Sequence, residues 1–282
     1  MKHTFIALSF LAAILSSCGG GASGKAQAQT APADETTKVL IKTDMGNITV
    51  KLYNETPFHR DNFLSLVEEH YYDSILFHRV IRNFMIQAGD PDSKTAEKGD
   101  TLGTGGPDYR IPAEISFPKF YHKRGALCAA RQADQVNPDR ASSASQFYIV
   151  TGRKYAPDDL KELEVQLRNQ EAQSMFYRLC SENNDTIRTL QQNGNEAGLQ
   201  QLQEELVRKT QAAIEKKGAF RFTKEQVATY TSVGGTPSLD GQYTVFGEVT
   251  DGMDVVEKIQ KAATDGRDRP KKDIRIISME IK

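Results

Sequence analysis

The stretch of sequence that decides the fold reads Phe77-His78-Arg79-Val80-Ile81-Arg82-Asn83-Phe84-Met85-Ile86-Gln87-Ala88-Gly89-Asp90-Pro91. Six of its side chains are too apolar to lie in solvent. Arg79 and Gln87 must therefore emerge from an apolar wall, and an apolar pocket with a few convergent polar groups is typical of a small binding site. The alternative is a core strand from which the arginine head reaches solvent along its apolar stem.

Short segments on both sides of this stretch alternate between apolar and polar residues. The segment from Val39 to Tyr53 turns at residues 44–47, which predicts a β-hairpin. A helix is expected to begin at Pro57, a second one over 253–262, and further strands at 125–130, 145–150, 243–249 and 274–281. Short strands with two helices favour a closed antiparallel barrel that is capped by the helices.

Residues 155–232 have a different pattern, rich in Glu, Gln, Lys, Arg and Leu, with apolar residues three or four apart. One helix is predicted from Leu160 to Leu190 and a second from Leu199 to Ala213, separated by a break at residues 193–195. A third, short helix is expected over 223–230. The longer two predict an antiparallel helical hairpin. It is either an insertion that packs on itself or a dock for a partner or client.

The first residues are expected to lie outside the folded domain. Residues 1–17 are predicted to be a lipoprotein signal peptide, because a basic start precedes an apolar run that is too short to span a bilayer. The segment Leu15-Ser16-Ser17-Cys18 resembles a bacterial lipobox, so Cys18 is expected to carry lipid. An ordinary secretory signal with a chance cysteine is the alternative. Residues 18–37 are predicted to be the lipidated cysteine and a flexible tether, which anchors the chain to the bacterial cell envelope facing the periplasm.

Composition narrows the class of protein. The chain has 282 residues, of which 38% are hydrophobic and 26% are charged, and its net charge is −1. This balance gives no sign of a nucleic-acid partner or of electrostatic attraction to a membrane. Cys128 and Cys180 are expected to be buried free thiols, although an oxidising compartment would also permit a disulfide.

The glycine-rich segment at 99–107 could suggest a phosphate-binding loop. It lacks the Lys-Ser/Thr pair of a P-loop, and Pro107-Asp108-Tyr109 is not typical of a helix start. Glycines that permit a tight surface turn explain this segment better. We therefore expect a surface loop that does not bind phosphate. We also expect that the protein uses neither a metal nor a cofactor.

The stretch from Phe77 to Pro91 closely resembles the signature of the cyclophilin family of peptidyl-prolyl cis-trans isomerases. Gly103 to Gly106 is similar to a loop of bacterial cyclophilins, and Ser238 to Gly247 matches the closing motif of the family. The resemblance implies a closed antiparallel eight-stranded barrel, capped by two helices. The isomerase domain would span 38–282, interrupted by the helical insertion at 155–232.

The resemblance also implies the roles of single residues. Arg79 would be the catalytic cation. The residues that would bind the substrate are Phe84, Met85, Gln87, Ala130, Arg131, Gln146, Tyr148, Leu239 and Tyr243. The family often has asparagine, phenylalanine, tryptophan and histidine where this chain has Arg131, Tyr148, Ser238 and Tyr243. His78 is expected to be a structural histidine whose ring nitrogens are both hydrogen-bonded.

The implied reaction is rotation about an X-Pro bond, whose barrier of ~18–20 kcal/mol comes from amide resonance. It requires a pocket for the prolyl ring and a cationic donor aimed at the prolyl nitrogen. We expect a monomer that acts on proline-containing polypeptides and assists the folding of exported proteins. The alternative is a module that binds proline segments with little turnover and acts mainly through its helical insertion.

Overall fold

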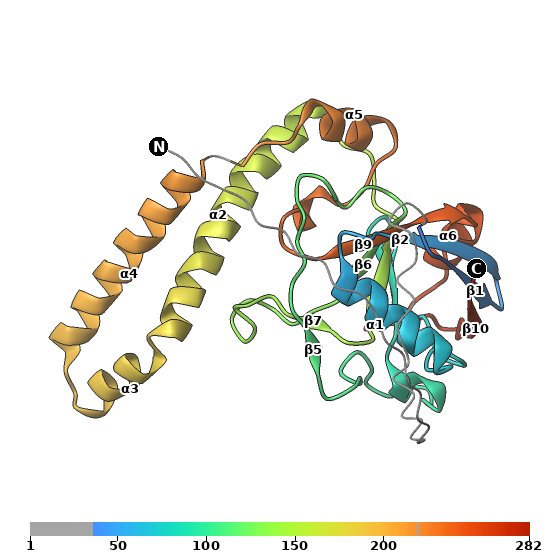
Figure 1. Ribbon diagram of the computed structural model, residues 1–282, viewed down its shortest axis with the longest axis horizontal. Helices are drawn as coiled ribbons and strands as arrows, with labels where there is room; N and C mark the ends of the chain where they lie inside the picture. Colours follow the sequence, from blue (N-terminus) through green and yellow to red (C-terminus); the bar gives the residue numbers. More distant parts are fainter. Residues whose placement is uncertain (1–35, 219) are drawn as a thin grey trace, which may run out of the picture. The chain divides into compact units, whose positions relative to one another are not determined.

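The computed structural model describes residues 36–218 and 220–282 (Figure 1). The predicted signal peptide and Cys18 lie outside the described residues, as does nearly all of the predicted tether. No helix in the described part of the chain is long and apolar enough to cross a membrane.

Eight strands form one sheet in which every neighbouring pair is antiparallel. Its order is β10 (Ile276–Ile281), β1 (Lys38–Thr43), β2 (Gly46–Leu52), β9 (Val245–Asp251), β6 (Ala126–Ala129), β8 (Phe147–Val150), β4 (Met85–Ala88) and β3 (Arg79–Ile81). Two short strands, β5 (Arg110–Ile111) and β7 (Ser142–Ser143), pair separately. The predicted strands are therefore all present in the structure.

The prediction of a closed barrel is wrong, because the sheet is an open half-barrel with β10 and β3 at its edges. Strand β3 has only three residues, and its Val80 N–H donates at 2.8 Å to the carbonyl of Asp268, which lies in a loop. The segments before β3 and β10 meet through an isolated bridge between Leu76 and Arg275. Backbone hydrogen bonds join residues 74–77 to Ile274 and Ile276, but in the described chain no ladder joins β3 itself to β10.

Two helices pack on the sheet, as expected. Helix α1 (Pro57–Glu68) lies against β10, and α6 (Met253–Gln260) lies against β2, β3 and β4. The first turn of α1 is capped by Glu114, whose carboxylate accepts hydrogen bonds from the backbone N–H groups of Phe58 and His59 at 3.1 and 2.9 Å. A carboxylate at this end satisfies free donors and complements the helix dipole.

The main core lies between the sheet and these helices. Phe63 of α1 is 2% exposed, and its ring packs against those of Tyr72, Phe147 and Phe246 at centroid distances of 5.1–5.5 Å. A second apolar cluster contains Met85, Ala126, Cys128, Tyr148, Val150 and Val245. Neither Cys128 nor Cys180 forms a disulfide; Cys128 is buried as expected, but Cys180 is partly exposed.

The inserted segment forms helices α2 (Pro157–Glu182), α3 (Asn184–Gln192), α4 (Glu196–Lys217) and α5 (Lys224–Ser232). The single helix predicted from Leu160 to Leu190 is wrong, because it is divided at Asn183. There φ and ψ are −105° and 16°, and the side-chain amide donates to the carbonyl of Leu179 at 2.8 Å. Asparagine side chains compete in this way with the helical hydrogen bonds of the backbone.

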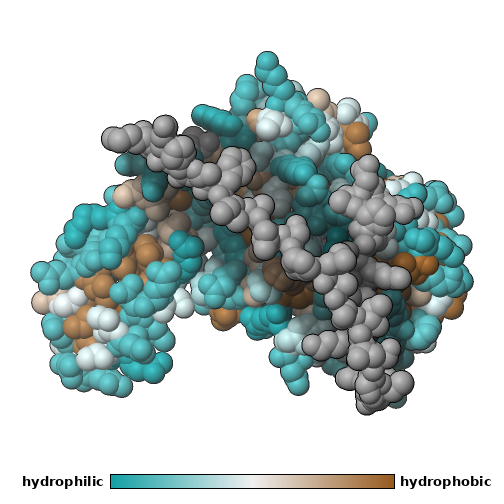
Figure 2. All heavy atoms as spheres, viewed as in Figure 1, coloured by the Kyte–Doolittle hydropathy of each residue, from teal (hydrophilic) through white to brown (hydrophobic). Residues whose placement is uncertain are grey.

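Helices α2 and α4 run side by side in opposite directions (Figure 1). Figure 2 shows apolar surface over this helical pair, surrounded by polar side chains. The insertion does not pack only on itself. Leu160, Leu167, Phe222 and Tyr230 share an apolar cluster with Tyr121, which lies outside the insertion.

Candidate functional site

One small cavity brings together nine side chains from distant parts of the sequence. Its volume is about 170 Å³, and it is lined by Arg79, Phe84, Met85, Gln87, Ala130, Arg131, Tyr148, Leu239 and Tyr243. All nine are residues that the sequence predicted for the site. The cavity is smaller than the clefts that hold drug-sized ligands, so its size suits one small apolar group.

The floor of the cavity follows from the alternation of side chains along β4. Met85 and Gln87 point to one face of the sheet, whereas Ile86 and Ala88 belong to the main core on the other face. Across the neighbouring strands, Arg79 lies opposite Gln87, and Gln87 lies opposite Tyr148. A cation, an amide and an aromatic ring therefore stand in one row at the cavity.

A series of hydrogen bonds runs from the polar side of the cavity, at Arg79 and Gln87, to the neighbouring Gln146. The guanidinium of Arg79 donates from Nη1 to Oε1 of Gln87 at 3.5 Å, and Gln87 donates to Oε1 of Gln146 at 3.0 Å. Nε of Arg79 also lies 3.6 Å from a carboxylate oxygen of Asp268. Because a guanidinium has five N–H donors, several remain for a ligand in the cavity.

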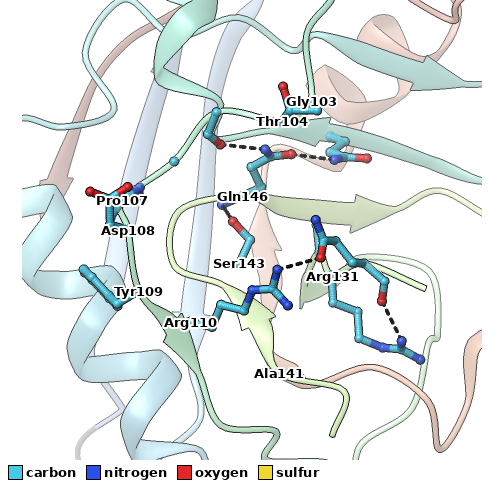
Figure 3. A pocket seen from close by; sticks show the side chains of 15 residues that line it. Gly103, Thr104, Pro107, Asp108, Tyr109, Arg110, Arg131, Ala141, Ser143 and Gln146 are labelled. Atoms are coloured by element: carbon cyan, nitrogen blue, oxygen red, sulfur yellow. Dashed lines mark hydrogen bonds between the residues drawn. The ribbon is translucent and has the colours of Figure 1, made fainter. Parts of the chain in front are cut away.

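A second cavity of about 450 Å³ adjoins the first and shares Gln87, Ala130 and Arg131 with it (Figure 3). Gln146 lines this second cavity rather than the first, and its side-chain amide donates to the carbonyl of Gly105 at 2.8 Å. The glycine-rich loop thus flanks the groove, as the resemblance implied.

Asp90 holds this loop in place. Its carboxylate accepts hydrogen bonds from the N–H groups of Gly103 at 2.5 Å and Gly105 at 3.3 Å. The turn before Asp90 requires glycine, because Gly89 has a φ of +102° and a Cβ there would lie 2.1 Å from the carbonyl oxygen of Ser145. The end of the signature therefore connects the sheet to the loop of the groove.

Comparison with known proteins agrees with this geometry. The model of the family described as cyclophilin type peptidyl-prolyl cis-trans isomerase/CLD matches residues 38–195 and 173–281. The chain belongs to the cyclophilin family.

Similar proteins occur in several bacteria. A protein of Staphylococcus saprophyticus, provisionally named a peptidyl-prolyl cis-trans isomerase, is 28% identical over 246 residues, which cover 86% of this chain and 91% of that protein. A Staphylococcus aureus protein with the same provisional name is 29% identical over 245 residues. A Streptococcus pyogenes protein, provisionally named a bifunctional phosphatase/peptidyl-prolyl cis-trans isomerase, is 30% identical over 248 residues. The match covers 86% of this chain but only 38% of that relative.

The fold is also similar to that of a cyclophilin of Cryptosporidium parvum, whose crystal structure superposes with a TM-score of 0.50 at 21% identity. That comparison covers 88% of this chain and 98% of the other. At this level of identity the likeness concerns the fold.

The charge of Arg131, a residue at which the sequence departs from the pattern implied by the resemblance, is compensated locally. Its side chain is only 2% exposed, pairs with Asp134 at 2.5 Å and donates to the carbonyl of Gln242 at 2.9 Å. The guanidinium carbon also lies 4.4 Å from the centre of the Tyr243 ring. Arg131 therefore shapes the rim of this cyclophilin pocket, whereas Arg79, with a side chain that is 43% exposed, faces the groove.

The helical insertion of this cyclophilin contacts the same rim. Ser174 of α2 accepts a hydrogen bond from Arg140 at 2.6 Å and itself donates to Asp134. Gln170 of α2 accepts a hydrogen bond from Gln242 at 2.9 Å. The insertion thus contacts Asp134 and Gln242, the two residues that bind the guanidinium of Arg131.

The prediction that His78 has both ring nitrogens satisfied is wrong. The residue is 4% exposed, and neither nitrogen has a hydrogen-bond partner among the described residues. Burial lowers the pKa of His78 to about 4, and the nearby carboxylate of Asp90 offsets only part of this effect. The imidazole is therefore neutral at pH 7.

This lowered pKa predicts a loss of stability in acid. Below pH 6.5 His78 is protonated in the unfolded chain but stays neutral in the folded chain. The contribution of His78 to the free energy of unfolding therefore falls progressively between pH 6.5 and about 4. From pH 7 to pH 4.5 we expect a loss of about 2 kcal/mol in the free energy of unfolding from this residue.

Urea denaturation at both pH values should show that His78→Leu loses less stability than the wild type over this interval. His70→Leu, at a side chain that is 74% exposed, is the control and should behave as the wild type. An equal loss in His78→Leu and the wild type would contradict the account.

Sequence reasoning missed two buried residues behind the cavity, His122 and Asp240. Tyr148 could have indicated them. A buried tyrosine hydroxyl needs a hydrogen-bond partner, whereas a phenylalanine at the same position would need none. The partner is Nε2 of His122 at 3.0 Å.

Proposed function

We propose that this cyclophilin catalyses cis-trans rotation about X-Pro bonds in proline-containing polypeptides, with Arg79 as the catalytic cation. The observation that carries the proposal is the row across β3, β4 and β8, in which the Arg79 guanidinium lies at a small cavity that also has apolar side chains in its wall. Phe84, Met85, Tyr148 and Leu239 would enclose the prolyl ring.

The proposed mechanism is electrostatic. A donor aimed at the prolyl nitrogen localises its lone pair, so that the C–N bond loses double-bond character and the barrier falls. Gln87 and Gln146, linked at 3.0 Å, would orient the backbone of the substrate. No step requires a proton transfer, which is consistent with a neutral His78 that is not an acid or base in the reaction.

The alternative, a module that binds proline segments with little turnover, lacks a specific observation in its favour. An assay of cis-trans isomerisation of a proline tetrapeptide, run beside a binding titration of the same peptide, separates the two functions. We expect turnover at low protein concentration. Binding without acceleration of isomerisation would overturn the proposed activity.

We also propose that the chain acts in the bacterial cell envelope, as a monomer that faces the periplasm, held by lipid on Cys18 and assisting exported proteins. The support is the sequence alone, in which an apolar run ends in Leu15-Ser16-Ser17-Cys18. Stable anchoring needs more than one acyl chain, which a lipidated N-terminal cysteine would carry.

The anchor has a direct test. Cys18→Ser should shift the protein from the detergent phase to the aqueous phase when the full chain is expressed in a bacterial host, because the site of acylation is lost. Isomerase activity should stay at the wild-type level, since the cavity is built from residues 79–243. Partitioning of both proteins into the aqueous phase would contradict the lipoprotein proposal.

A further inference from the structure

A buried chain of hydrogen bonds connects the cavity to the helical insertion. The hydroxyl of Tyr148, which lines the cavity, lies 3.0 Å from Nε2 of His122, and Nδ1 of His122 lies 2.9 Å from Oδ1 of Asp240. The other carboxylate oxygen of Asp240 accepts a hydrogen bond from the hydroxyl of Tyr230 at 2.6 Å. Tyr230 belongs to α5, the last helix of the insertion.

The direction of each hydrogen bond follows from the acceptors. Oδ1 of Asp240 also accepts the backbone N–H of His122 at 2.8 Å, so one oxygen fixes both the backbone and the ring of the histidine. Because an ionised carboxylate only accepts, Nδ1 of His122 donates to Asp240, and in the neutral tautomer that this leaves, Nε2 is the acceptor for the hydroxyl of Tyr148. The hydroxyls of Tyr148 and Tyr230 are thus the donors at the two ends of this series of hydrogen bonds.

The surroundings allow these groups little freedom. The side chains of His122 and Asp240 are 1% and 0% exposed, and Tyr230 is 0% exposed. A Cβ at Gly235 would lie 2.6 Å from the Tyr230 ring and 2.3 Å from the carbonyl oxygen of His122, so the backbone is packed tightly against both. In a dry site, an unsatisfied donor or acceptor is costly, and a network that is fully satisfied fixes one arrangement.

Asp240 fixes two walls of the cavity at once. Through His122 it holds the ring of Tyr148, and through the peptide bond it holds Leu239, which also lines the cavity. Tyr230 supplies the hydrogen bond to Oδ2 of this carboxylate from outside the sheet.

We propose that Tyr230 is a positioning residue for the proline pocket, through which the helical insertion holds Asp240, His122 and Tyr148 in place. The inference rests on the proposed function, because it assigns Tyr230 to the site that binds the prolyl ring. The insertion is then part of the isomerase site, in addition to any contact that it makes with clients.

The test is Tyr230→Phe in the full chain, which removes one hydroxyl and keeps the ring. Tyr148 and Leu239 would contact the prolyl ring in the ground state and in the transition state alike, so a misplaced wall weakens binding of both. We expect KM and Kd for a proline tetrapeptide to rise on the order of 10-fold, with kcat nearly unchanged. A small displacement of groups in a site can change its performance by up to about 10²-fold. A variant that is only less stable would lower kcat with the amount of folded protein and leave KM and Kd as in the wild type, and that result would overturn the proposal.

Tyr177→Phe is the matched control, because its hydroxyl lies on α2 of the same insertion and accepts a hydrogen bond from Gln173. It should leave KM and Kd unchanged, and an equal rise in both variants would overturn the proposal. In the background of Tyr148→Phe, the effect of Tyr230→Phe should shrink, because the two hydroxyls act through one chain. Additive effects would show that Tyr230 does not act through Tyr148.

A readout without substrate separates this inference from the proposed function. The methyl resonances of Met85 and Leu239 report the shape of the empty cavity, and we expect them to shift in Tyr230→Phe but not in Tyr177→Phe. If the wild type does not bind or isomerise the peptide, the proposed function fails, while the methyl shifts still decide whether Tyr230 shapes the cavity. Unchanged methyl resonances in a folded Tyr230→Phe protein would overturn the inference.

Discussion

Arg79→Ala should lower kcat/KM for a proline tetrapeptide by about 10²–10³, because a donor aimed at charge that develops in the transition state contributes ~2.7–4 kcal/mol. The change should appear mainly in kcat, since the apolar walls that hold the prolyl ring remain. Stability should change little, because the Arg79 side chain is 43% exposed and its partner Asp268 is equally exposed.

Two further variants make this prediction specific. Arg79→Lys should recover only part of the activity, because an ammonium group lacks the planar fork of a guanidinium. Arg82→Ala is the matched control, since it removes an exposed arginine of the same segment that does not line the cavity, and it should keep wild-type activity. Wild-type activity in Arg79→Ala would exclude Arg79 as the catalytic cation.

Phe63→Ala should produce a large loss of stability. The ring is 2% exposed and packs against Tyr72, Phe147 and Phe246, so its removal loses buried apolar area and leaves a cavity in the centre of the core. We expect a decrease of about 3–5 kcal/mol in the free energy of unfolding, measured by denaturant titration.

Phe58→Ala is the control for this prediction, because it makes the same change on the same helix at a side chain that is 62% exposed. Its effect should stay within about 0.5 kcal/mol. Equal stability of the two variants would show that Phe63 does not hold α1 against the sheet.

The residues of the pocket could be predicted because they lie in short segments whose order and chemistry are specific. Alternation along 85–88 fixes which side chains face the cavity, and the resemblance to cyclophilins identifies Arg79, Leu239 and Tyr243 in segments far apart in the sequence. Such patterns are local, and a sequence shows them directly.

The features that could not be predicted depend on contacts between distant segments. Whether a sheet closes depends on a single short edge strand, and here Val80 bonds to a loop at Asp268 instead of a strand. The break at Asn183 depends on one side chain that competes with the backbone of its helix. The hydrogen bonds through His122 and Asp240 join Tyr148 to Tyr230, 82 positions further along the sequence. No periodic pattern of residue types in the sequence predicts such contacts.

The most direct test of the central claim is exchange NMR on a proline peptide with the wild type and with Arg79→Ala. This measurement reports binding and the rate of cis-trans exchange in the same sample. We predict that both proteins bind the peptide and shift the resonances of the cavity residues. We also predict that exchange is fast with the wild type and slower by about 10²–10³ with Arg79→Ala. Fast exchange with Arg79→Ala, or binding by the wild type without exchange, would contradict the account.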